Sequence, residues 1–312
     1  MGKIAFVFPG QGSQCVGMGK DIYESSKAGQ LIFDTANSVL NMDIKTMCFD
    51  GPEEDLKQTI NTQPAILTTS IALLEAFKEK SNVTPDYVAG HSLGEYSALY
   101  ASQALELENV LKIVQKRGAL MNEVATGSMA AVIGMAQDVV EDCVKKASVA
   151  GVVSVANYNS PAQIVITGED NAIEKACDLL KEAGAKRVIP LAVSGAFHSA
   201  LMKSAADEFG VFVSDFEVKD AVCGLISNAD AEVTQSAEDL KRKMPEQIYS
   251  SVYWTQTINK MFELGVDTII EIGPGKVLTG LIKKINSEIK TYNIYDVESL
   301  NHVVDELNMV NV

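Results

Sequence analysis

The stretch VAGHSLGEYSALYASQAL, residues 88–105, places a serine in a tight corner between two glycines. The residues before Gly90 read as the end of a buried strand, and a helix-forming run begins at Glu95. The spacing G-x-S-x-G at Gly90, Ser92 and Gly94 is typical of a nucleophile elbow, a sharp strand-to-helix turn that projects a serine hydroxyl. The start of the helix also favours negative charge beside this hydroxyl. A plain helix N-cap is the alternative interpretation of the serine.

The composition bounds the class of protein. The chain has 312 residues, of which 47% are hydrophobic, and a formal net charge of −15. This suits one large domain or two unequal ones, and the acidic charge disfavours nucleic acid as a partner. No apolar run reaches the ~20 residues of a membrane span, and the apolar N-terminal stretch is too short for a signal peptide, so we expect no membrane association. Five scattered cysteines predict neither a zinc site nor disulfides, which favours the cytoplasm.

Strand and helix patterns alternate in the first part of the chain, which predicts a mainly parallel α/β sheet. From about residue 127 the order becomes β-α-β-β-α-β, that of a ferredoxin-like unit. We therefore expect an α/β fold with a large α/β-hydrolase-like domain, residues 1–126 and 198–312, and an inserted ferredoxin-like (βαββαβ) subdomain, residues 127–197. Helix 63–80 is expected to be amphipathic, and residues 157–163 to form a hairpin loop. The other expected strands are 4–8, 87–89, 129–134, 152–157, 163–168, 186–193, 268–272 and 291–297, and the other expected helices are 95–104, 107–121, 138–148, 171–183, 254–264 and 277–285.

A serine nucleophile needs a base, and histidine is the usual base near neutral pH. The chain has three histidines. His91 directly precedes the serine, so its side chain should point away from it, and His302 lies among polar residues in the tail. His198 therefore remains as the candidate base. No Asp or Glu between Ser92 and His198 stands out as a third member, so a serine–histidine pair oriented by a backbone carbonyl fits the sequence at least as well as a triad.

A serine that attacks a carbonyl group creates an oxyanion, which needs N–H donors beside the serine. Leu93 supplies an N–H directly after it, and the turn GQGSQ, residues 10–14, lets the backbone approach a ligand closely. The spacing of this turn fits neither a phosphate loop nor a dinucleotide fingerprint, so no nucleotide is expected. Arg117, in VQKRGALM, offers a rigid fork for a substrate carboxylate. A surface arginine in a helical salt bridge is the alternative.

Seven motifs follow one another along the chain: PGQGSQ (9–14), TQPAIL (62–67), GHSLGEY (90–96), QKRGALM (115–121), NYNSPAQIVITG (157–168), GAFHSALM (195–202) and EIGPGKVLTGL (271–281). Together they resemble the malonyl-CoA:acyl-carrier-protein transacylases of bacterial fatty-acid synthesis and the related acyltransferase domains of polyketide synthases. The resemblance covers essentially the whole chain.

The resemblance implies ping-pong acyl transfer by a cytoplasmic monomer. A serine takes the malonyl group from malonyl-CoA and passes it to the phosphopantetheine thiol of acyl carrier protein, and no metal or bound cofactor is required. Matching positions imply these roles: Ser92 as nucleophile, His198 as base, Gln11 and Leu93 as oxyanion donors through their N–H groups, Arg117 as partner of the malonyl carboxylate, Gln63 and Asn159 as pocket residues, Phe197 as the bulky residue that disfavours a branched acyl group, and the main-chain carbonyl of Tyr253 as the group that orients the histidine.

Two positions depart from the family pattern. Tyr253 stands where some relatives carry glutamine, and Ser251 stands where proline is common. Two other functions stay open: a serine esterase or thioesterase with water as acceptor, and a carrier-binding protein without activity. The acceptor could also belong to polyketide rather than fatty-acid synthesis. Because both proteins are acidic, we expect the carrier to meet a local basic patch at Lys276, Lys283 and Lys284.

Overall fold

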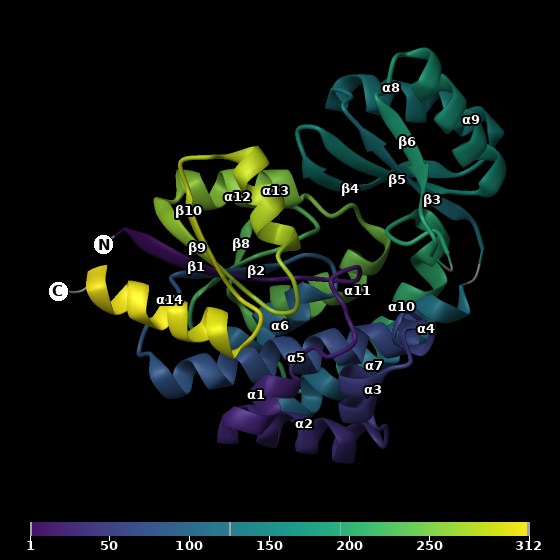
Figure 1. Cartoon of the computed structure of the whole chain (residues 1–312). Helices are drawn as coiled ribbons and strands as arrows, with labels where there is room; N and C mark the ends of the chain where they lie inside the picture. The colour runs from purple at the N-terminus through teal and green to yellow at the C-terminus, as the bar shows by residue number, and fades with distance from the viewer. Residues whose placement is uncertain (1, 125, 194, 311–312) are drawn as a thin grey trace.

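Two β-sheets organise the computed structural model, which describes residues 2–124, 126–193 and 195–310; the expected domain ends at residues 1 and 312 lie outside this part. The larger sheet has six strands in the order β10-β9-β1-β2-β7-β8 (Figure 1). Its neighbouring strands pair in parallel except for β7 and β8, which confirms the expected parallel α/β sheet. The strands are β1 (Lys3–Phe8), β2 (Tyr87–Gly90), β7 (Gly224–Ile226), β8 (Val233–Thr234), β9 (Val266–Ile272) and β10 (Lys290–Ile294).

The carboxyl ends of β1 and β2 meet at one edge of this sheet. Phe8 pairs with Gly90, and the His91 N–H donates to the Phe8 carbonyl at 3.0 Å. β1 reads KIAFVF and is buried after its first residue, the pattern of a parallel strand covered on both faces. The loops that follow the two strands therefore lie side by side, and residues 10–14 come next to Ser92.

Helix α5 (Thr59–Lys80) packs deep inside the large domain. Its residues 62–74 are buried without interruption, so the expectation of an amphipathic helix is wrong. The reason is that neighbours enclose the helix on all sides, and such a helix needs no polar face. These neighbours include β9, α2 (Lys27–Leu40), α6 (Gly94–Ala101) and α7 (Leu107–Glu123).

The smaller sheet has the strand order β4-β5-β3-β6, with antiparallel pairing throughout. With two helices packed on the face away from the larger sheet, this is the expected ferredoxin-like unit (Figure 1). β4 continues to Ser160, so the hairpin loop to β5 shrinks to residues 161–162 instead of the expected 157–163. The elements are β3 (Ser128–Ile133), α8 (Gln137–Ala147), β4 (Val153–Ser160), β5 (Gln163–Gly168), α9 (Asp170–Glu182) and β6 (Arg187–Pro190).

A short segment of the large domain pairs with β4 and ties the two sheets together. The Val252 N–H donates to the Ala156 carbonyl at 2.7 Å, and the Tyr158 N–H donates to the Val252 carbonyl at 2.9 Å. The ring of Tyr253 stacks on that of Tyr158 with centroids 5.2 Å apart. Ser251 Oγ donates to a β4 carbonyl at 2.6 Å. The two positions that depart from the family pattern thus lie in this junction.

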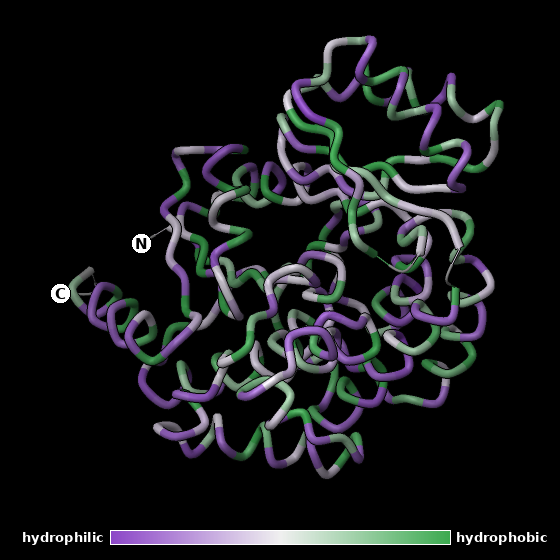
Figure 2. The backbone as a smooth tube through the Cα atoms, turned by 45° about the vertical axis from the view of Figure 1, so that its right-hand side comes forward, coloured by the Kyte–Doolittle hydropathy of each residue, from purple (hydrophilic) through white to green (hydrophobic). Residues whose placement is uncertain are grey.

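The remaining helices cover the larger sheet and its edges. Hydrophobic and hydrophilic residues alternate along the outer helix α14 (Figure 2), which is the pattern of a helix with one face against the core. In the part of the chain that the structure describes, no helix is both long and apolar enough to cross a membrane. These helices are α1 (Lys20–Ser25), α3 (Ile44–Asp50), α4 (Glu53–Leu56), α10 (Lys203–Ser214), α11 (Ala237–Tyr249), α12 (Trp254–Glu263), α13 (Val277–Ile285) and α14 (Val297–Val310), with 3-10 turns at Ser148–Ala150 and Ala200–Met202.

Candidate active site

Ser92 forms the corner between β2 and α6. Its φ of 49° lies in the left-handed region that residues with a side chain rarely adopt. A Cβ on Gly90 would lie 1.9 Å from the carbonyl carbon of Gly94, and a Cβ on Gly94 would lie 2.0 Å from the carbonyl oxygen of Phe8. Strand, turn and helix therefore approach too closely for a side chain at either glycine. This is the geometry of a nucleophile elbow.

The serine hydroxyl meets a histidine from a distant part of the chain. Ser92 Oγ lies 2.8 Å from His198 Nε2. His198 Nδ1 lies 3.0 Å from the carbonyl oxygen of Gln247 and 3.1 Å from that of Ser250. Because a carbonyl oxygen can only accept, Nδ1 carries the hydrogen and Nε2 is free to accept the serine proton. The structure thus brings together the serine–histidine pair that the sequence suggested, oriented by backbone carbonyls.

The expectation that the Tyr253 carbonyl orients the histidine is wrong. That carbonyl accepts the Thr257 N–H at 2.8 Å inside the first turn of α12. Gln247 instead lies in the last turn of α11, where carbonyl groups have no partner within the helix. The end of a helix therefore supplies the acceptor, six residues earlier in the chain than expected.

Burial decides the protonation state of His198. Burial first, and the nearby Arg117 charge second, lower the pKa of His198 from its usual 6.5 to about 3. The imidazole is therefore neutral at physiological pH, which is the form that accepts a proton. His91 turns away, as expected, and its Nε2 lies 2.7 Å from Asn159 Oδ1.

Arg117 extends from α7 to the serine. The residue is 1% exposed, and its Nη2 donates to Ser92 Oγ at 3.2 Å. Its other acceptors are amide oxygens: Gln63 Oε1 at 2.7 Å and Gln247 Oε1 at 3.0 Å. Among the described residues no carboxylate lies within ion-pair distance, so the alternative of a surface salt bridge is wrong. Burial lowers the pKa of Arg117, yet a guanidinium keeps its charge in proteins, so a buried positive charge faces the serine.

A cavity of about 120 Å³ lies over the serine. It opens beside a larger cavity of about 720 Å³ between the two sheets, and both are lined by Gln11 and His91. Asn159 lines only the larger cavity, together with Lys57 and Lys284, whereas Gln63 and Phe197 line the smaller one. The other residues that line the cavity over the serine are Ser92, Leu93, Arg117, Met121, Met129, Asn157, Leu191, Val193 and His198.

Three polar residues near the serine were not found from the sequence. Gln247 Nε2 donates to the Ser92 carbonyl at 2.8 Å. Asn228 Oδ1 accepts the Ser92 N–H at 2.7 Å, and Glu95 accepts the Asn228 N–H at 2.6 Å. Burial raises the pKa of the Glu95 carboxyl to about 7. Glu95 falls within the GHSLGEY motif, but only the fold shows that Asn228 and Gln247 lie against the elbow.

The fold and this site define a class: α/β proteins that hold a serine–histidine pair on a nucleophile elbow, with a buried cation beside it. The family model described as "Acyl transferase domain" matches residues 5–302. The malonyl CoA-acyl carrier protein transacylase of Bacillus subtilis is 48% identical, and the alignment covers 100% of this chain and 99% of the relative. The chain belongs to this acyltransferase family, among relatives named malonyl CoA-acyl carrier protein transacylase.

Solved structures of similar proteins share the fold. The crystal structure of the malonyl-transacylase of Streptococcus pneumoniae is 44% identical with a TM-score of 0.93, covering 97% of this chain and 100% of that one. A malonyl-transacylase in complex with its type II polyketide-synthase acyl-carrier protein is 40% identical with a TM-score of 0.94, covering 97% and 99%. Because the TM-scores are this high over nearly the whole chain, the similar structures share the arrangement of both sheets.

Proposed function

We propose that this chain transfers a malonyl group from malonyl-CoA to the phosphopantetheine thiol of acyl carrier protein, through a malonyl ester of Ser92. The choice of malonyl as the acyl group rests on the buried guanidinium of Arg117. Its Nη2 lies 3.2 Å from Ser92 Oγ, and its other partners are amide oxygens rather than a carboxylate. A substrate with a free carboxylate neutralises this charge, and a guanidinium fork pairs well with a carboxylate.

The reaction proceeds in two half-reactions. His198 Nε2 takes the proton from Ser92 Oγ as the oxygen attacks the thioester carbonyl of malonyl-CoA. The N–H groups of Gln11 and Leu93, which line the cavity with the serine, bind the oxyanion. The C–S bond then breaks, and the coenzyme A thiolate leaves with the proton from the imidazole. In the second half, His198 removes the proton from the carrier thiol as its sulfur attacks the ester carbonyl. The C–O bond to Ser92 then breaks, and the imidazolium returns the proton to Ser92 Oγ.

The two cavities divide the substrate between them. The malonyl group occupies the cavity of about 120 Å³, where Gln63 holds Arg117 and Phe197 crowds the α-carbon against branched acyl groups. The pantetheine arm extends through the cavity of about 720 Å³, past Asn159. Both thioester substrates carry this arm, so one channel serves both half-reactions. Apart from the phosphopantetheine of the carrier, the proposed reaction uses no cofactor.

The acidic carrier docks against α13, which carries lysines at both of its ends. Lys283 and Lys284 stand in the last turn of this helix, and Lys276 directly precedes it. Lys284 also lines the larger cavity, so the patch borders the channel that the phosphopantetheine must enter. We place the acceptor in fatty-acid synthesis. The complex of a 40% identical relative with a polyketide carrier makes polyketide synthesis the second candidate, and parallel assays with the two kinds of carrier distinguish them.

Intact-mass spectrometry after incubation with a panel of acyl-CoAs tests this function. We expect one malonyl adduct, on Ser92, that Ser92→Ala abolishes, and a loss of several orders of magnitude in transfer for His198→Ala because the pair acts as a unit. A label on Cys15 would overturn the assignment. Rapid turnover of malonyl-CoA without an acceptor would indicate a thioesterase instead. Light scattering of the same sample checks the further proposal that the enzyme is a monomer.

A further inference from the structure

We propose that Asn228 is a positioning residue of the nucleophile elbow, whose side-chain amide fixes the backbone at Gly90 and at Ser92 and so sets the direction of the serine hydroxyl. The inference rests on the proposed role of Ser92 as nucleophile. Asn228 does not line the cavity over the serine, and it acts through the elbow rather than on the substrate.

The amide of Asn228 bridges the turn. Its Oδ1 accepts the Ser92 N–H at 2.7 Å, and its Nδ2 donates to the Gly90 carbonyl at 2.7 Å. The side chain thus bonds to the backbone one residue before and one residue after His91. A side-chain amide carries an acceptor oxygen and a donor nitrogen in one plane, and it does so at every physiological pH.

The elbow needs such support because of its backbone conformation. Ser92 has a φ of 49°, and a strained conformation persists only where the surroundings hold it. The bond to Asn228 also engages the Ser92 N–H, which leaves oxyanion binding to the N–H groups of Leu93 and Gln11. Asn228 therefore separates the donor that shapes the elbow from the donors that face the substrate.

The backbone N–H, the backbone carbonyl and the side-chain amide of Asn228 all form hydrogen bonds. Its N–H donates to Glu95 Oε2 at 2.6 Å, and its carbonyl accepts the Tyr253 N–H at 3.0 Å. Gln247 Nε2 lies 3.4 Å from Oδ1. Glu95 belongs to α6, the helix that starts at the elbow, so the contacts form a closed ring around the turn. The residue is 0% exposed, and its side chain has no room to move away.

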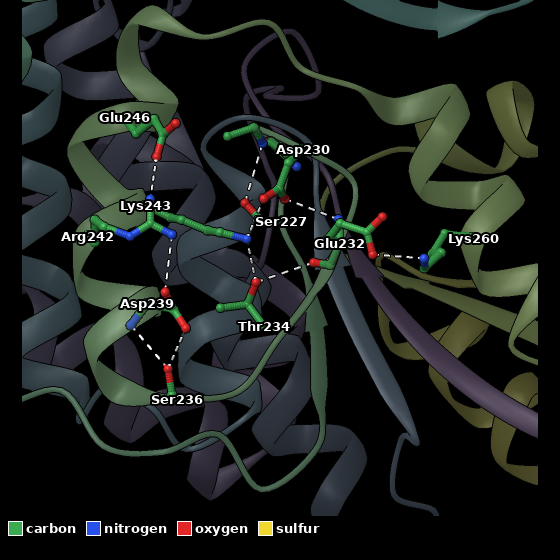
Figure 3. Close-up of polar contacts among 12 residues, drawn as sticks. Ser227, Asp230, Glu232, Thr234, Ser236, Asp239, Arg242, Lys243, Glu246 and Lys260 are labelled. Carbon is green, nitrogen blue, oxygen red and sulfur yellow. Dashed lines mark hydrogen bonds and ion pairs between the residues drawn. The ribbon is translucent and has the colours of Figure 1, made fainter.

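The loop that carries Asn228 is anchored to α11. Lys243 of that helix bonds Asp230 at 2.7 Å and Thr234 at 2.7 Å, which Figure 3 shows together with the contacts around them. The same helix presents the Gln247 carbonyl to His198. One rigid unit therefore positions both members of the pair: the imidazole through Gln247 and the serine through Asn228.

Asn228→Ala tests the proposal. We expect the rate constant for acylation of Ser92 to fall roughly a hundredfold, as for other small misplacements of a reacting group. The KM for malonyl-CoA should stay within about threefold of the wild-type value, since the binding residues are untouched. Acylation by acetyl-CoA should fall by the same factor, because the elbow acts on every acyl group alike. Ser227→Ala is the matched control: this neighbour is also buried, but within the described part of the chain its Oγ makes a single long hydrogen bond, from the Ala229 N–H at 3.4 Å.

Asn228→Asp gives a second readout, the pH profile of acylation. This profile would not change if Asn228 only stabilised the fold. A protonated carboxyl can accept the Ser92 N–H and donate to the Gly90 carbonyl, as the amide does, but an ionised carboxylate cannot donate. Acylation by this variant should therefore be near wild type at low pH and decline as the pH rises through the pKa of the new carboxyl, which burial raises. Arg117 and Lys243 are charged groups around the site that lower that pKa, and Asp230 raises it. Burial raises the pKa of Glu95 to about 7, so Glu95 adds a raising effect only in the upper part of the pH range. His198 is neutral.

The outcomes separate this proposal from the proposed function. Circular dichroism and thermal melts establish that each variant is folded. A folded Asn228→Ala that acylates at the wild-type rate, or that loses malonyl but not acetyl transfer, overturns the positioning role. If this variant fails to fold, the Asn228→Asp profile decides, and a profile parallel to wild type overturns the role. A wild-type enzyme without a malonyl adduct on Ser92 removes the proposed function itself.

Discussion

The main-chain carbonyl of Gln247 accepts the Nδ1–H of His198 at 3.0 Å, while its side-chain Oε1 accepts an N–H of Arg117 at 3.0 Å. A single residue therefore orients both the proposed base and the proposed carboxylate partner. Substitution of its side chain leaves the first contact in place and removes the second. The two roles can thus be measured separately.

Gln247→Ala should lower kcat/KM for malonyl-CoA by about 10- to 150-fold. Arg117 loses a hydrogen bond, and bonds to charged groups contribute about 1.5–3 kcal/mol. Acetyl transfer should fall less, because the carbonyl still orients the imidazole. Steady-state kinetics with both substrates measure the ratio, with Gln137→Ala, an exposed glutamine whose Nε2 bonds Glu141, as control. Equal losses for both substrates would assign the side chain to the elbow alone.

Arg117→Ala should invert the acyl specificity. Removal of one partner of a buried charge pair costs about 2–5 kcal/mol, so kcat/KM for malonyl-CoA should fall roughly 30- to several-thousand-fold. Acetyl-CoA has no carboxylate, and its slow transfer should persist or improve once the unpaired cation is gone. Competition between the two substrates, read by intact mass, measures the change. A parallel fall in both would mean that Arg117 holds the fold rather than the substrate.

The acylation half-reaction should be insensitive to pH over the physiological range. The pKa of His198 is lowered to about 3, so the neutral, active form predominates above that value and is lost only as the pH falls towards it. Rapid-quench measurements from about pH 5 to pH 8 should give a flat profile, whereas an ordinary histidine would give a midpoint near its unperturbed pKa of about 6.5. Arg117→Ala removes the second cause of the shift, so the acid limb should move to higher pH. A midpoint near the ordinary value in the wild type would contradict the buried, neutral base.

Reversal of charge on α13 should affect only the carrier. Lys283→Glu should raise the KM for acyl carrier protein and leave that for malonyl-CoA unchanged, because long-range attraction to the acidic carrier is lost. Lys284→Glu is the less specific variant, since Lys284 lines the cavity that both substrates enter. Lys175→Glu, exposed on α9, is the matched control. Equal effects on the two substrates, or none, would remove this patch as the docking site.

The parts of the site that lie close together in sequence, or that rest on rare residue types, could be predicted. The glycines around Ser92 indicate the elbow by spacing alone, and His198 follows by elimination among three histidines. Asn228 and Gln247 could not be found this way, because amides are common and only the fold brings the loop after β7 and the last turn of α11 against the elbow. The wrong expectation for Tyr253 has the same cause: the sequence does not show which carbonyls a helix end leaves without a partner.

The fold, too, could be predicted from the sequence only in part. The alternation of strands and helices predicted the smaller sheet and four of the six strands of the larger one. Strands β7 and β8 were not predicted, because runs of three and two residues give no recognisable pattern. The short helices α1, α3 and α4 were not predicted, because they are too short for a helical period to stand out. The longer helices α2, α10 and α11 were not predicted either. The burial of α5 depends on α2 and α7, which pack on it from other parts of the chain. A local pattern cannot report such enclosure.

The pairing of Val252 with β4 bears on attempts to exchange parts between relatives. The ferredoxin-like unit is not a self-contained module, because residues 251–253 of the large domain contact its edge strand β4. Val252 pairs with this strand, Ser251 bonds to it, and the ring of Tyr253 stacks on that of Tyr158. The next residue back, Ser250, supplies a carbonyl to His198. A chimera that replaces residues 127–197 alone would therefore mismatch this seam and disturb the imidazole as well. A graft must carry residues 250–255 with it.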